Sequence, residues 1–163
     1  MRLLRALAIG AVGICLTVGV AIVVIQSFWI TYGVFVRYVL GSPDSMVTEA
    51  TALLLIPLAF LGLPYALKED AFPRVTFITD KLSPRTAAIV AKINLAIMIL
   101  VGLFYAAVSV NATISTYRSG ESSSVLGWPE YVFWAPVGIA SIVFVVYGLV
   151  EVCTGGRTAP PDA

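Results

Sequence analysis

Four long runs without a charged residue constrain this chain more than any other feature of its sequence. They cover residues 6–36, 50–67, 93–117 and 131–150. A helix needs about 20 mostly apolar residues to cross the roughly 30 Å hydrocarbon core of a membrane. Each run reaches or approaches that length, and together they occupy most of the chain. The sequence therefore predicts an all-α membrane protein with four transmembrane helices.

The composition supports this interpretation. Charged residues make up 12% of the 163 residues and hydrophobic residues 60%, whereas soluble domains carry about 25% charged residues. A soluble fold of this length could not bury so much apolar surface, because small domains keep much of their surface in water. The net charge of +1 creates no broad field that would attract nucleic acid, so we expect no nucleic-acid partner.

Helix-start signals refine the expected bounds of the second and third helices. Ser42 and Ser83 are each suited to cap a helix, and each is followed by a proline, which fits the first helical position. Pro57 and Pro64 each remove a backbone donor from the second helix and predict a kink. The expected helices span about residues 6–36, 43–67, 84–117 and 131–150.

The remaining segments are short. Residues 68–83 are too polar to cross the membrane and predict a short interfacial helix between the second and third spans, on the cytoplasmic side. The composition of residues 156–163 is typical of a disordered tail, which leaves one transmembrane domain over residues 1–155. The first apolar run exceeds the 7–15 residues typical of a signal-peptide core, so we expect a retained helix.

The distribution of Lys and Arg predicts the orientation, because basic residues concentrate on the cytoplasmic side of membrane proteins. With the N-terminus inside, the outer loops hold only Arg37 and Arg118. The inner segments hold Arg2, Arg5, Lys68, Arg74, Lys81, Arg85, Lys92 and Arg157. We therefore expect a multi-pass protein of the bacterial inner membrane with both termini in the cytoplasm.

The sequence offers few groups that could perform chemistry. The chain has no histidine, which excludes a Ser-His-Asp triad and haem ligation by histidine. Cys15 and Cys153 lack metal-ligand spacing and are interpreted as small buried apolar residues. The four runs contain no charged side chain of the kind that marks a transport pathway. We expect no enzymatic activity, no metal and no cofactor.

Polar and small residues inside the runs predict how the helices pack. Polar side chains such as Gln26 and Ser109 are expected to form hydrogen bonds between helices. Small residues four positions apart allow close helix approach. They occur in the pairs Ala6 and Gly10, and Gly102 and Ala106.

A charged cluster between the first two helices has two interpretations. Arg37, Asp44 and Glu49 lie close together in the sequence, with uncharged residues far on either side. Arg37 and Glu49 could form an interfacial ion pair that closes the loop, a contact of about 0–1 kcal/mol. Alternatively, they could form a docking point for another membrane protein.

Three stretches resemble the small membrane subunit of tripartite ATP-independent periplasmic (TRAP) transporters. The first contains Arg37, Tyr38 and Gly41, followed by Pro43 and Glu49 at the start of the second helix. The second is AFLGLPYALKEDAFPRV, at the end of that helix. The third is LGWPEYVFWAPVG, at the entry to the fourth helix. Their order and the four-helix layout carry the resemblance over roughly residues 10–150.

The resemblance implies a role without catalysis. In that family the small subunit pairs with a much larger membrane subunit, which holds the substrate and sodium sites. A separate periplasmic binding protein delivers an organic acid. The small subunit is implied to anchor and brace the large one, with membrane lipids around both. The candidate interface residues are Arg37, Tyr38, Glu49, Lys68, Arg74, Pro129, Trp134 and Pro136.

Two other functions fit the same four-helix layout. One is the small subunit of a tripartite tricarboxylate transporter, for which the motif match is poorer. The other is a stand-alone membrane anchor or sensor, which would be stable without a large subunit.

Overall fold

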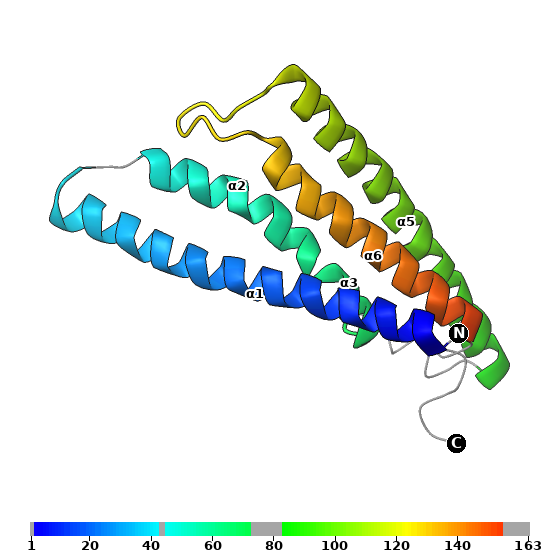
Figure 1. Cartoon of the computed structure of the whole chain (residues 1–163). Coiled ribbons are helices and arrows are strands. Elements are labelled where there is room, and N and C mark those ends of the chain that lie inside the picture. The colour runs from blue at the N-terminus through cyan, green and yellow to red at the C-terminus, as the bar shows by residue number, and fades with distance from the viewer. Residues whose placement is uncertain (1, 43–44, 73–82, 155–163) are drawn as a thin grey trace.

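The computed structural model describes residues 2–42, 45–72 and 83–154, and the elements within these ranges are helical (Figure 1). The helices are α1 (Arg2–Val39), α2 (Ser45–Leu61), α3 (Leu63–Lys68), α5 (Pro84–Ser119) and α6 (Tyr131–Thr154). Four segments are long and apolar enough to cross a membrane, with α2 and α3 forming one of them. The predicted all-α class with four membrane-spanning helices is confirmed.

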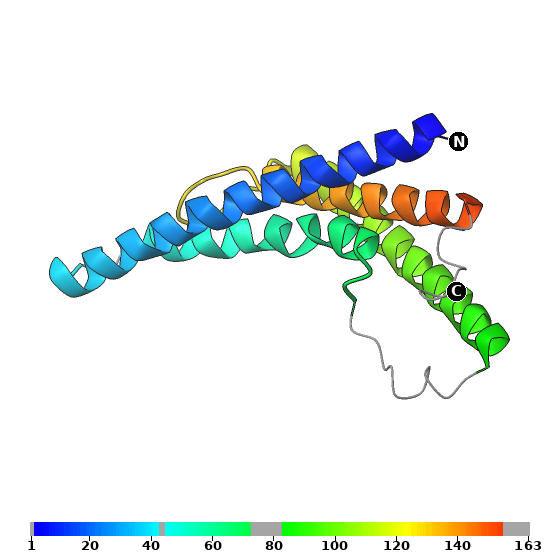
Figure 2. The same ribbon diagram turned by 90° about the horizontal axis from the view of Figure 1, so that it is seen from below.

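Helix α6 is the centre of the bundle. It contacts α1, α2, α3 and α5. In its apolar 18-residue stretch 50% of the residues are buried, compared with 17% in that of α5. Its buried residues include Val137, Ala140 and Phe144. Helix α5 packs almost entirely on α6, and Figure 2 shows its first half diverging from α2 and α3. The first half of α5 therefore stands apart from α2 and α3, whereas Phe60 of α2 and Tyr105 of α5 meet edge to face, with ring centroids 5.2 Å apart.

Helix α1 packs through one narrow stripe. Its buried residues Ala8, Val12, Cys15 and Gly19 recur at alternating spacings of three and four, the period that keeps side chains on one helix face. At 38 residues it is about 57 Å long, well above the roughly 30 Å hydrocarbon core. Most of its other large apolar side chains are exposed, so they face lipid or a partner.

The second membrane span is broken where the sequence predicts a kink. Helix α2 ends at Leu61, Gly62 intervenes, and α3 begins at Leu63 with Pro64 in its first turn. Pro64 has no N–H and cannot continue the hydrogen-bond ladder, which explains the break. Pro57 lies inside α2 without ending it. The predicted Pro43 helix start lies outside the described residues.

The predicted start of the third span is confirmed. Ser83 caps α5, and its hydroxyl accepts a hydrogen bond from the backbone N–H of Thr86 at 3.3 Å. The helix ends at Ser119 and is capped by Gly120, whose φ of 68° lies in the left-handed region that favours glycine. The interfacial helix predicted over 68–83 and the predicted tail fall largely outside the described residues.

Two expectations about small side chains need correction. Gly102 allows close packing, since a Cβ there would lie 2.7 Å from Phe144 Cδ1. Gly10 has no atom of the described residues within 4 Å of such a Cβ, so the Ala6 and Gly10 pair marks no contact with another described helix. Cys15 is buried as expected, but Cys153 is exposed because it lies on the outer side of the last turn of α6.

Candidate partner interface

Glu49 ties two distant parts of the chain together. Its carboxylate accepts hydrogen bonds from the backbone N–H of Val125, at 3.0 Å to each oxygen, and from that of Leu126 at 2.7 Å. Glu49 lies near the start of α2 and the two donors lie in the loop between α5 and α6. Hydrogen bonds to an ionised acceptor are among the stronger ones in proteins. We call this arrangement the Glu49 clamp.

The loop that Glu49 holds is itself compact. Ser123 N–H donates to the Trp128 carbonyl at 2.9 Å, and the Ser123 hydroxyl accepts from Trp128 N–H at 3.1 Å. Gly127 has a φ of 63°, which permits the tight turn. The Trp128 ring stacks on Phe133 with centroids 6.1 Å apart. The clamp therefore holds a preformed hairpin against the bundle.

Of the two interpretations of the charged cluster, the structure does not form the ion pair between Arg37 and Glu49. Both residues are described, and Glu49 binds the hairpin instead of Arg37. The reason is that two backbone N–H groups from the hairpin approach its carboxylate, whereas Arg37 lies on the exposed surface of α1. Tyr38 is also exposed, at 79%. Arg37 and Tyr38 are thus open to a partner, while Glu49 is engaged within the chain.

The other predicted interface residues lie at both ends of the bundle. Pro129 ends the hairpin opposite Ser122, Trp134 is half-buried in the first turn of α6, and Pro136 is half-buried in the next turn. Lys68, at the far end of the second span, donates to Glu69 at 2.7 Å and lies 5.2 Å from the Tyr65 ring centroid. Arg74 lies outside the described residues.

A second polar cluster lies at the end of the bundle that holds the start of α1, and the sequence analysis did not anticipate it. The Glu151 carboxylate accepts a hydrogen bond from the Tyr147 hydroxyl at 3.0 Å. It also forms an ion pair with the Arg5 guanidinium at 3.5 Å. Glu151 is only 5% exposed. Glu151 lies just beyond the fourth uncharged run, and it is buried because α6 continues past that run to Thr154 and carries this residue into the packing.

Polar groups inside the spans behave only partly as predicted. The Gln26 amide donates to the Thr51 carbonyl at 3.0 Å and joins α1 to α2. Ser109 instead donates to its own helix, at the Tyr105 carbonyl, at 2.6 Å. Thr113 does the same at the Ser109 carbonyl. Hydroxyls satisfied this way leave few polar groups facing the membrane.

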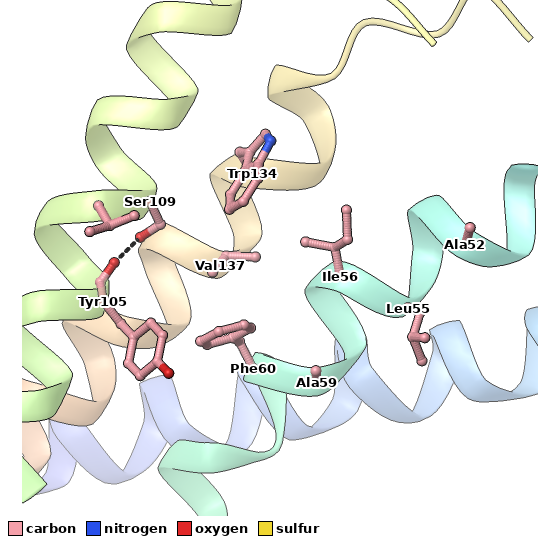
Figure 3. Close-up of a pocket in the computed structure, with 10 residues that line it drawn as sticks. Ala52, Leu55, Ile56, Ala59, Phe60, Tyr105, Ser109, Trp134 and Val137 are labelled. Carbon is pink, nitrogen blue, oxygen red and sulfur yellow. Dashed lines mark hydrogen bonds between the residues drawn. The ribbon is translucent and has the colours of Figure 1, made fainter. Parts of the chain in front are cut away.

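An apolar groove lies between α2 and α5, and residues of α6 also line it (Figure 3). It consists of two adjoining hollows of about 400 and 370 Å³ that share Ala59, Phe60 and Tyr105. Trp134 lies along the first hollow and points into it from α6. Because the walls are almost wholly apolar, the groove suits a lipid chain or an apolar partner side chain.

Replacing Glu49 by glutamine is expected to loosen the hairpin. The amide cannot offer two charged acceptor atoms, so we expect the Val125 and Leu126 amides to exchange hydrogen about fivefold faster, equivalent to about 1 kcal/mol. Hydrogen exchange followed by mass spectrometry measures this. Glu121→Gln removes the same charge from the hairpin's exposed side and is the matched control. Unchanged exchange in Glu49→Gln would contradict the clamp.

Comparison with known families identifies the family of the chain. A family model described as "Tripartite ATP-independent periplasmic transporters, DctQ component" matches residues 27–158. The match covers both the Glu49 clamp and the Glu151 cluster, apart from Arg5. No curated protein gives a significant match to the chain. The resemblance deduced from the three sequence stretches is therefore confirmed.

Proposed function

The chain belongs to the DctQ family of TRAP transporter components, and from this premise we propose that it braces the large membrane subunit of a sodium-coupled importer of an organic acid. The large subunit would hold the substrate and sodium sites, and a periplasmic binding protein would deliver the solute. The chain itself would be non-catalytic. Its four apolar spans make it a multi-pass membrane protein, and we place both termini in the cytoplasm.

The observation that carries the bracing role is that the bundle is tied at both ends. The Glu49 clamp joins α2 to the α5–α6 hairpin, and the ion pair of Arg5 with Glu151 joins α1 to α6. Between these ties, α1 and α5 present long exposed apolar faces. A subunit that keeps its own shape while offering apolar faces is suited to hold the immobile part of a larger partner.

Within this proposal, the predicted interface residues other than Glu49 divide by position. Arg37 and Tyr38 at the end of α1 would contact the large subunit near the periplasmic surface. Lys68 and Arg74 would lie near the cytoplasmic surface. Pro129, Trp134 and Pro136 would shape the hairpin and the groove, and neighbouring residues would make the contact with the large subunit. Lipid would fill any part of the groove that the partner does not occupy.

Purification of the complex tests the proposal. The tagged chain is co-expressed with the large subunit from the same operon, extracted in a mild detergent and weighed intact by native mass spectrometry. We expect a stable complex with one large polytopic subunit. In proteoliposomes, organic-acid uptake should require both subunits, a sodium gradient and the binding protein.

Two outcomes would overturn the proposal. A chain that purifies folded and monodisperse without the large subunit would indicate a stand-alone anchor or sensor. Solute uptake by liposomes that contain only this chain would show that it has a pathway of its own. Uptake that needs both subunits but no sodium would remove only the coupling.

A further inference from the structure

Helix α5 forms one edge of the bundle, and no other helix of the described residues covers its side opposite α6 (Figure 1). We define the outer face of α5 by exposed residues that recur at spacings of three and four. They are Ile93, Ile97, Leu100, Phe104, Ala107, Asn111 and Ser115. Leu100 and Phe104 are 67% and 63% exposed. The face is apolar along most of its length, as expected for a surface within the membrane.

Asn111 and Ser115 break that apolar pattern. They lie one helical turn apart, and neither side chain forms a hydrogen bond with any residue in the described parts of the chain. Their neighbours behave differently: Ser109, Thr113 and Thr116 all donate to carbonyls of α5. The Asn111 amide has two donors and an acceptor, and one helix cannot satisfy all of them.

The position of Asn111 along α5 places it within the hydrocarbon core. The uncharged run of this helix covers residues 93–117, with its centre at residue 105. Asn111 lies about 9 Å from that centre, inside the roughly 15 Å that separates the centre of a bilayer from the edge of its hydrocarbon region. At that depth lipid chains offer no hydrogen bonds, so an exposed amide is costly unless another protein group meets it.

We propose that the outer face of α5 packs against a transmembrane helix of the large subunit, with Asn111 hydrogen-bonded across the contact. This inference rests on the proposed function. The required occupant is a helix that presents a polar side chain or a free carbonyl at the depth of Asn111. Ala107 and Ser115 are small, which lets a partner backbone come close to the amide. A lipid acyl chain matches the apolar residues but leaves the amide unsatisfied.

Site-specific photo-crosslinking tests this contact in the purified complex. Benzoylphenylalanine replaces Phe104 on the outer face of α5 or, to probe α1 as the competing contact face, Phe28, which is 74% exposed. Irradiation of the Phe104 variant is expected to give a covalent adduct with the large subunit. Adducts with lipid alone, or with a second copy of this chain, would overturn the inference.

The same experiment separates this inference from the proposed function. A complex that contains the large subunit but crosslinks through Phe28 and not through Phe104 overturns the α5 contact and leaves the bracing role intact. Failure of the large subunit to co-purify with the unmodified chain overturns both.

Substitution of Asn111 provides a second readout. Asn111→Leu is expected to weaken binding of the large subunit about threefold, the size of an average interhelical hydrogen bond in a membrane. Asn111→Gln keeps the amide and should restore most of the affinity, measured as the dissociation constant of reconstituted subunits in nanodiscs. Equal affinity of the Leu variant and the unmodified chain would overturn the hydrogen bond.

Discussion

Gly102→Ala is expected to destabilise the bundle by about 1–3 kcal/mol, the range found for overpacked cores. The added Cβ would lie 2.7 Å from Phe144 Cδ1 and 2.9 Å from Val145 Cγ2. Val145 is β-branched and both side chains are buried, so neither can move away cheaply. Because α5 packs almost entirely on α6, the clash lies within the main contact that holds α5 in the bundle. Gly102→Leu should be more destabilising still.

Reversible unfolding in mixed micelles, as the fraction of SDS is raised, measures this effect. Gly10→Ala is the matched control, because it makes the same change on α1 at a position where no described neighbour lies within 4 Å of the added Cβ. It should be neutral or stabilise the helix by up to about 1 kcal/mol, since alanine is the better helix former. Similar unfolding of Gly102→Ala and the unmodified chain would show that α5 is not held at this point.

The positions of the helices could be predicted because local sequence determines them. An uncharged run long enough to cross the membrane, with a capping serine before a proline at Ser83, contains both the reason for a helix and its start. The break near Pro64 follows from a missing N–H in the same segment. The close approach of two helices at Gly102 could also be predicted from its small size. Gly10 shows the limit of that signal, because a small residue marks a close approach only where another helix is present.

The partners of charged groups could not be predicted, because tertiary packing selects them. Glu49 is 76 residues away from Val125, and nothing in either segment indicates their pairing. The nearest basic residue, Arg37, was a reasonable partner by sequence distance alone. Glu151 was missed because a charge after an apolar run usually marks the end of a span. The signal was Tyr147, one helical turn earlier, which can present its hydroxyl to the carboxylate.

Tyr147→Phe is expected to destabilise the bundle by about 1.5–3 kcal/mol, the contribution of a hydrogen bond to a charged group. The Tyr147 hydroxyl donates to Glu151 at 3.0 Å, and both residues are 5% exposed. Water cannot readily replace the lost donor at such a buried site. Arg5 would remain at 3.5 Å, but its side chain is 49% exposed, so solvent screens its attraction for the carboxylate.

A double substitution distinguishes the loss of a donor from a simple loss of packing. Tyr147→Phe combined with Glu151→Leu removes the donor and the acceptor together, so it should destabilise the chain less than Tyr147→Phe alone. Tyr38→Phe, at a residue that is 79% exposed, is the control and should change little. If the double variant instead loses the sum of the two single effects, the Glu151 cluster contributes by packing and not by satisfying a buried carboxylate, and the tie between α1 and α6 must come from the apolar stripe of α1.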